Sequence, residues 1–199
     1  MASTLVLDTE TTGFMRKELP AHHASQPWVV QIGAQLFDDD TRRVVGEVNF
    51  IVDPRSVGGS LAGNEEAGKI HGITNEMIDA YGVSYKVGIA AFNNLLKRAD
   101  TIVAHNMPFD FGILCSCYER MEVNTGPLKA PRSECTVKLT KNILKLPGKY
   151  KDFKWPNLME AYTALVDPAG FDGAHDAMVD VRACAAVYWA VKDGGKLLA

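Results

Sequence analysis

The stretch "LVLDTETTG" (residues 5–13) joins an apolar run to two acids, Asp8 and Glu10. The run is short and rich in β-forming residues, so it predicts a strand over residues 3–9. Side chains two apart on a strand share a face, which holds for Asp8 and Glu10 if the strand persists through Glu10. Buried neighbouring carboxylates are unfavourable, whereas Mg²⁺ or Mn²⁺ accepts both as ligands. The alternative is that the acids mark a solvated strand end.

The surrounding sequence predicts an α/β fold in one domain, residues 1–199. Two further strands flank a turn signal at residues 38–41 and form a hairpin, and a short buried strand follows later. Short helical pieces between residues 60 and 80 precede the longer helices. The strands are expected over 28–38, 43–53 and 101–106, and the helices over 85–99, from Pro108, and over 133–146, 156–166 and 174–192. This order implies a mixed sheet with helices on its faces.

Composition excludes several classes of protein. The 199 residues are 47% hydrophobic, which is enough for one core. The N-terminus lacks the pattern of a signal peptide, and no stretch approaches the roughly 18 apolar residues that cross a bilayer. We therefore expect no membrane association, a cytoplasmic location and reduced thiols at the four cysteines.

Charge is unevenly distributed along the chain. The net charge is −3, yet residues 138–154 hold six lysines and one aspartate, a balance of +5 that leaves −8 for the remainder. A basic stretch beside clustered acids suits a polyanion held next to metal ions. The alternative is a solvated lysine-rich helix and loop.

Further acids follow other predicted elements. "AHNMPFDF" places Asp110 after a buried strand, and "GAHDAMVDV" places His175 and Asp180 around the start of the last helix. Sites in open α/β sheets form beyond the carboxyl ends of strands, so these groups can converge with Asp8 and Glu10. Five residues turn a helix by about 500°, so His175 can reach Asp180 only from the loop or first turn. Asp176 is a candidate helix cap.

These motifs carry a family resemblance. "LDTETTG", "HNMPFD" and "HDAMVD" resemble, in order and spacing, the three motifs of the DEDDh 3′–5′ exonuclease family, which includes proofreading subunits. "VVQIGAQLFD", "IHGIT" and "WPNLMEAY" are similar to its connecting segments. The resemblance implies a ribonuclease H-like fold, with a mixed five-stranded sheet whose first three strands are antiparallel and whose later part is parallel α/β. Gln31 and Cys135 depart from the acids that many relatives carry there.

The resemblance also implies a two-metal hydrolase. Asp8, Glu10 and Asp180 would bind one Mg²⁺, Asp8 would be shared with a second, and Asp110 would support it; Mn²⁺ is expected to substitute. His175 would be the general base, since imidazole titrates near neutral pH. The expected reaction releases nucleoside monophosphates from 3′ ends of single-stranded nucleic acid, with DNA favoured over RNA. A replication or repair role beside a polymerase or another protein is expected. The alternative is an exonuclease fold that has become a binding module or scaffold.

Substrate contacts are implied by the same resemblance, and each has a structural alternative. Phe14 can stack on a base or tuck onto the core, and Phe109 can stack or staple its helix. His105 and Asn106 can touch the nucleic acid or orient the strand end. The full set of expected contacts is Thr9, Thr11, Thr12, Phe14, His105, Asn106 and Phe109.

Overall fold

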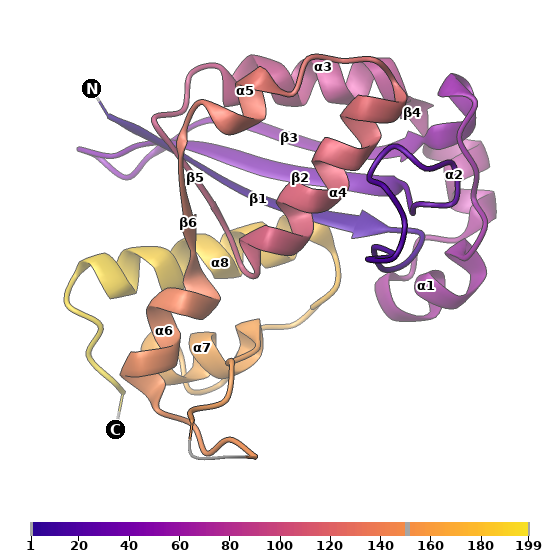
Figure 1. Cartoon of the computed structure of the whole chain (residues 1–199). Coiled ribbons are helices and arrows are strands. Elements are labelled where there is room, and N and C mark those ends of the chain that lie inside the picture. Colours follow the sequence, from indigo (N-terminus) through magenta and orange to yellow (C-terminus); the bar gives the residue numbers. More distant parts are fainter. Residues whose placement is uncertain (1, 150–151, 199) are drawn as a thin grey trace.

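A mixed six-stranded sheet forms the centre of the computed structural model, which describes residues 2–149 and 152–198 (Figure 1). The spatial order is β4-β3-β2-β1-β5-β6. The β1–β2 and β2–β3 pairs are antiparallel, and the β3–β4, β1–β5 and β5–β6 pairs are parallel. The strands are β1 (Ser3–Thr11), β2 (Val29–Asp38), β3 (Val44–Asp53), β4 (Val83–Ser84), β5 (Thr101–Ala104) and β6 (Arg132–Cys135). This confirms the mixed α/β sheet with three antiparallel strands first.

The strand count corrects the expectation of five. Residues 133–135, predicted as the start of a helix, belong to β6, which pairs in parallel with β5 from Thr101 opposite Arg132 to Ala104 opposite Cys135. This pairing joins segments about thirty residues apart, so no local periodicity reveals it. The two-residue β4 beside Val52 was missed for the same reason. The strand expected over 101–106 ends at Ala104, because Asn106 takes a left-handed conformation with φ 80°.

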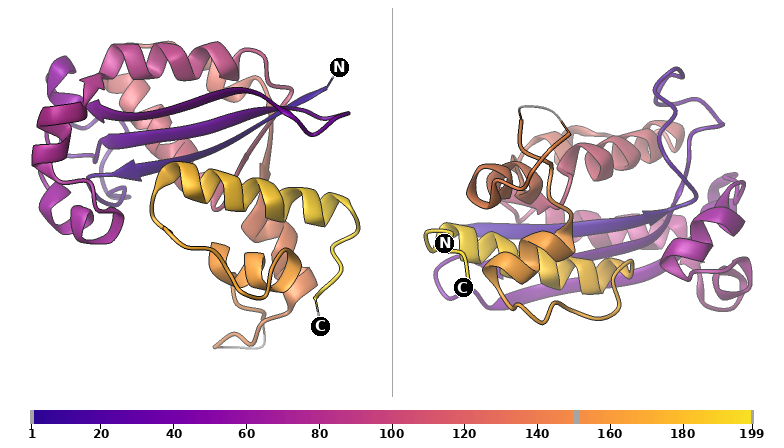
Figure 2. Two further views of the ribbon diagram at one scale, coloured as in Figure 1. Left: turned by 180° about the vertical axis from the view of Figure 1, so that it is seen from behind. Right: turned by 90° about the horizontal axis from the view of Figure 1, so that it is seen from below.

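The helices form layers on both faces of the sheet (Figure 2). Helices α3 and α4 cover one face, α8 covers the other, and α6 and α7 pack on the side of α8 away from the sheet. The helices are α1 (Asn64–His71), α2 (Asn75–Tyr81), α3 (Tyr85–Leu96), α4 (Met107–Arg120), α5 (Gly126–Lys129), α6 (Thr136–Leu144), α7 (Leu158–Leu165) and α8 (Ala177–Lys192), with a 3₁₀ turn at Pro54–Val57. None of the described helices is long and apolar enough to cross a lipid bilayer.

The two faces of β1 bury different cores. Leu5 and Leu7 pack in the cluster that includes α3 and α4, whereas Val6 packs against Met178 and Val181 of α8. Because side chains alternate along a strand, Asp8 and Glu10 continue the row of Val6 and face the α8 side. Thr9 lies on the α4 side. The strand therefore presents its two acids where its apolar row ends.

The N-terminal end of α8 lies directly on β2. The Gln31 side chain accepts a hydrogen bond from the Ala177 N–H at 3.1 Å and donates one to the Asp176 carboxylate at 3.2 Å. A Cβ atom added to Gly33 would lie 2.8 Å from the carbonyl carbon and oxygen of Ala177. At position 31 of β2 a side chain fits and hydrogen-bonds to the start of α8. At position 33 there is no room for any side chain.

We predict that Gly33→Ala destabilises the fold by about 1–3 kcal/mol, because the added methyl group pushes the start of α8 away from the sheet. The matched control is Gly112→Ala on α4, where the added Cβ has no heavy atom within 4 Å. That change should stabilise the helix by about 0.5–1 kcal/mol. Urea unfolding measures both, and equal effects of the two substitutions would refute the close approach.

Candidate active site

Four carboxylates converge at the carboxyl end of β1. Asp8 and Glu10 come from the strand, while Asp110 and Asp180 lie in the first turns of α4 and α8. Burial raises the pKa of Asp8 well above its usual value, and the charges of Asp110, Glu10 and Asp180 raise it further. The three predicted motifs therefore meet at one place.

The pKa values of the other three acids of the cluster are also raised. Burial, followed by repulsion from Asp180 and Asp110, raises the pKa of Glu10 to about 8. Burial raises the pKa of Asp110 to about 7, although hydrogen bonds from Thr9 oppose the shift, and burial also raises the pKa of Asp180. A cluster of this kind gains from a cation that binds the ionised form.

The donor atoms fit a divalent cation. One ligand atom from each of Glu10, His175 and Asp180 lies within 4.8 Å of the others. The Oδ1 atom of Asp180 is buried and has no hydrogen-bond partner in the described part of the chain. A buried oxygen without a partner is costly, and carboxylate oxygens are the ligands that Mg²⁺ and Mn²⁺ prefer. These residues can therefore hold a divalent cation, and the group contains His175, which the resemblance implies as the general base, beside two of the four expected ligands.

Thr9 holds Asp110 in place. Its backbone N–H and its hydroxyl both donate to the Oδ1 atom of Asp110, at 3.1 and 2.9 Å. Asp110 is 2% exposed, so these bonds fix the carboxylate inside the site. Thr9, expected to contact substrate, thus has its hydroxyl directed at a neighbouring acid.

His175 lies just before α8, as its spacing from Asp180 requires. It adopts a left-handed conformation with φ 70°, and its backbone N–H donates to the Oδ2 atom of Asp180 at 3.1 Å. The side chain is exposed. Asp176 caps the helix by accepting from the N–H groups of Met178 and Val179, as predicted.

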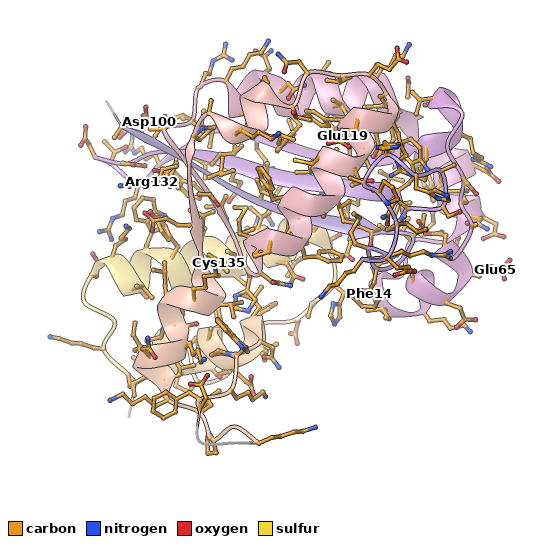
Figure 3. The ribbon with its side chains drawn as sticks, viewed as in Figure 1. Phe14, Glu65, Asp100, Glu119, Arg132 and Cys135 are labelled. Atoms are coloured by element: carbon orange, nitrogen blue, oxygen red, sulfur yellow. The ribbon has the colours of Figure 1, made fainter. Side chains whose placement is uncertain are left out.

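Six of the seven predicted substrate contacts line one cavity of about 790 Å³, which we call the α1-side cavity. Phe14 is 80% exposed, and its ring meets that of Phe109 edge-on with centroids 5.9 Å apart. Figure 3 shows Phe14 on the loop that follows β1. The six residues are Thr9, Thr11, Thr12, Phe14, Asn106 and Phe109, and Glu10 and His175 line the cavity with them.

Other parts of this cavity are structural or were not predicted. The Thr11 hydroxyl donates to the Gly13 carbonyl, and the Thr12 hydroxyl accepts from the Trp28 N–H, so both threonines shape the turn. The opposite wall includes Ile70 and His71 of α1. The similarity of "IHGIT" to a family segment was the available signal for them.

A second cavity of about 680 Å³, the α6-side cavity, adjoins the same acids. Asp8, Asp180, His175 and Asn106 line it, together with residues of α6 and of the segment before α7. Trp155, which is 55% exposed, was not predicted; its place depends on how the loop before α7 packs. Asn106 and His175 line both cavities, so the two cavities adjoin each other beside the carboxylates.

His105 lines the α6-side cavity but, unlike the other six predicted contacts, not the α1-side cavity. Its Nδ1 atom is 2.9 Å from the Thr136 hydroxyl, and its Nε2 atom is 3.1 Å from the Pro156 carbonyl. Burial lowers the pKa of His105 to about 4. These contacts match the alternative in which His105 holds the end of β5 in place.

The loop between β1 and β2 is anchored on α4. The Arg120 guanidinium donates to the carbonyls of Gln26 and Pro27 and lies 3.7 Å from the ring centroid of Trp28. The Gln26 side chain in turn bonds the backbone of Arg16 at both its amide atoms. The loop that carries Phe14 is thus tied to the helix that carries Asp110.

Ion pairs with acidic side chains neutralise part of the lysine-rich stretch, residues 138–154. Lys141 pairs with Asp152, and Lys154 pairs with Glu160. Lys138 lines the α6-side cavity. Lys151 lies outside the described residues. The stretch therefore does not act as one uniform basic surface.

The raised pKa values predict that the acid cluster destabilises the metal-free protein increasingly as pH rises above the usual pKa of a carboxylic acid. The unfolded chain ionises these acids near pH 4, whereas the folded site resists ionisation up to about pH 8, so stability falls as pH rises through this range. Glu10→Gln removes one repelling charge and should raise the metal-free Tm at pH 8 by a few degrees. For a domain of this size, each kcal/mol of added stability raises the Tm by about 2–4 °C. Thermal unfolding with EDTA measures this.

The same variant should lose most of the stabilisation that Mn²⁺ confers on the wild type at pH 8. The control is Glu65→Gln, an exposed acid of α1, which should leave both the metal-free Tm and the Mn²⁺ shift unchanged. A wild-type Tm that does not respond to Mn²⁺, or a Glu10→Gln variant that is less stable at pH 8 in EDTA, would contradict a strained metal site.

Comparison with known proteins places the fold. Exonuclease I from E. coli in complex with a dT13 oligonucleotide gives a TM-score of 0.74 at 20% identity, covering 96% of this chain and 41% of that chain. The zinc-bound E. coli ExoI–ssDNA complex gives 0.70 at 20% identity over 96% and 40%. Exonuclease I from Methylocaldum szegediense gives 0.71 at 20% identity over 98% and 41%. The chain thus spans about two fifths of these proteins, which share its ribonuclease H-like fold.

A match to a family sequence model assigns the chain to a protein family. No curated protein sequence matches the chain. The exonuclease family model RNase_T matches residues 5–188, which include all three motifs. The chain therefore belongs to the DEDD-type exonuclease family.

Proposed function

We propose that this protein is a metal-dependent 3′–5′ exonuclease that releases nucleoside monophosphates from single-stranded nucleic acid. The observation that carries the proposal is the convergence of four carboxylates, from three separate segments, beside the exposed imidazole of His175. Family membership supports the reaction class. Residues 1–199 would act as one exonuclease domain.

Asp8, Glu10, Asp110 and Asp180 would hold two Mg²⁺ ions, or Mn²⁺ in their place, with Asp8 shared between them. Ions bound there lower the pKa of water and stabilise charge on a leaving oxygen. The role of Thr9 is to keep Asp110 oriented through its two hydrogen bonds. Gln31 keeps the start of α8, and with it Asp180, against the sheet.

His175 would act as the general base. Its ring shares the carboxylate cluster with Glu10 and Asp180, and its backbone is tied to Asp180. A neutral imidazole there can take the proton from the attacking water as the terminal phosphodiester is cleaved. The 3′ oxygen of the shortened strand leaves, and the last nucleotide departs with a 5′ phosphate.

The α1-side cavity would receive the terminal nucleotide. Phe14 and Phe109 offer aromatic faces for a base, and base–aromatic stacking is typical of single-strand sites. DNA is the substrate we favour, because the solved neighbours of like fold hold single-stranded DNA. A polymerase or another replication or repair protein would be the partner.

We predict that the protein shortens 5′-labelled single-stranded DNA to a ladder in Mg²⁺ or Mn²⁺, and not in EDTA. Digestion from the other end would release the labelled mononucleotide at once, so the pattern reports direction. Asp8→Ala should abolish the ladder, and His175→Ala should slow it by about 10²–10⁴-fold. Asp40→Ala, in the exposed turn between β2 and β3, should cleave like the wild type.

A matching RNA oligomer in parallel lanes shows whether the protein degrades DNA faster than RNA. Full-length substrate in every lane, from protein shown to be folded by circular dichroism, would overturn the exonuclease proposal. The binding-module alternative would then take its place.

A further inference from the structure

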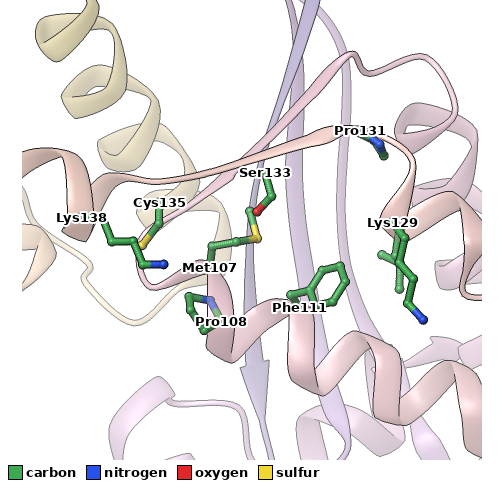
Figure 4. A pocket seen from close by; sticks show the side chains of 9 residues that line it. Met107, Pro108, Phe111, Lys129, Pro131, Ser133, Cys135 and Lys138 are labelled. Carbon is green, nitrogen blue, oxygen red and sulfur yellow. The ribbon is translucent and has the colours of Figure 1, made fainter.

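A groove of about 450 Å³ lies between α4 and β6, and we call it the β6 groove (Figure 4). Met107, Pro108 and Phe111 of α4 line it together with Cys135 of β6. In Figure 4 these residues lie between two lysines, Lys138 at one end and Lys129 at the other. The groove is thus apolar along its length and basic at its ends.

The β6 groove is continuous with the catalytic site. Pro108, Cys135 and Lys138 line both this groove and the α6-side cavity, and the latter also contains Asp8 and Asp180. A nucleic-acid strand that extends from the carboxylates through the α6-side cavity therefore enters the β6 groove without crossing another helix or strand of the protein.

The charges of the groove suit a phosphate backbone. Lys129 and Lys138 are both exposed, and neither forms an ion pair with a carboxylate in the part of the chain that the structure describes. None of the described lining residues is acidic. The α1-side cavity differs, because Glu10 and Glu66 line it. Each upstream nucleotide brings a phosphate, so the upstream strand needs the basic side.

We propose that the β6 groove binds the nucleotides on the 5′ side of the scissile phosphate. Lys138 contacts a phosphate next to the site, Lys129 contacts one further upstream, and the bases lie on the apolar floor that includes Phe111. Single-strand sites combine cations with apolar or aromatic platforms in this way. The inference rests on the proposed function and assigns where the rest of its substrate lies.

The test compares a single-stranded DNA dodecamer with a dinucleotide of the same 3′ sequence, which does not extend to Lys129. Lys129→Ala should raise the KM for the dodecamer several-fold with kcat unchanged, and should lower its kcat/KM relative to that of the dinucleotide. Its log KM against log salt slope should fall by about 0.7, the value for one lost phosphate contact. Lys129→Arg should restore the wild-type ratio, because it keeps the charge.

Phe111→Leu tests the floor without leaving a large void, and it should lower the same ratio. The control is Lys86→Ala, an exposed lysine of α3, which should match the wild type on both substrates. Equal losses on dodecamer and dinucleotide, or an unchanged ratio in Lys129→Ala and Phe111→Leu, would overturn the proposal.

A binding measurement separates failure of this inference from failure of the exonuclease function. Fluorescence anisotropy of the labelled dodecamer, in Ca²⁺ or EDTA, needs no hydrolysis. If the wild type cleaves nothing but Lys129→Ala weakens binding, the β6 groove is a nucleic-acid-binding site and the exonuclease proposal is refuted. If the wild type cleaves and Lys129→Ala binds normally, the exonuclease proposal is supported and the proposed role of the β6 groove is refuted.

Discussion

The desolvation and mutual repulsion of half-buried and buried carboxylates at the end of β1 form the constraint on which the site depends. Asp8, Glu10 and Asp110 each have a raised pKa because burial and neighbouring charge disfavour ionisation. Two features of the fold act against this repulsion. The positive N-terminal ends of α4 and α8 both lie beside the cluster, with Asp110 and Asp180 in their first turns. Divalent cations at the proposed metal site would supply the remaining positive charge that the carboxylates need.

Residues around the acids serve the framework as much as the chemistry. Thr9, Thr12 and His105 have their polar side-chain atoms engaged within the protein. Phe14 and Asn106 remain exposed, so they are available to a ligand. Rigid support of this kind matters because misplacing a reacting group by about 1 Å can cost about 10²-fold in rate.

The distribution of charge around the site supports the proposed path of the substrate. Acids line both cavities, but a lysine, Lys138, lines only the α6-side cavity, and the β6 groove that continues from it is lined by Lys138 and Lys129. A terminal nucleotide adds little charge beyond the scissile phosphate, but the upstream strand adds one charge per residue. The asymmetry is compatible with a net charge of −3, because the local field and not the average is what a polyanion meets.

The sequence alone determined the parts that depend on local pattern. Alternation along β1 placed Asp8 and Glu10 on one face, the turn before β3 predicted the hairpin, and the spacing of His175 and Asp180 required a histidine before the helix. The tertiary structure decided what depends on distant pairing. Strand β6 exists because Arg132–Cys135 finds β5, the partners of His105 come from two later segments, and the β6 groove forms only where α4 meets that added strand. Periodicity reports one segment at a time, whereas these features arise from contacts between segments that lie far apart along the chain.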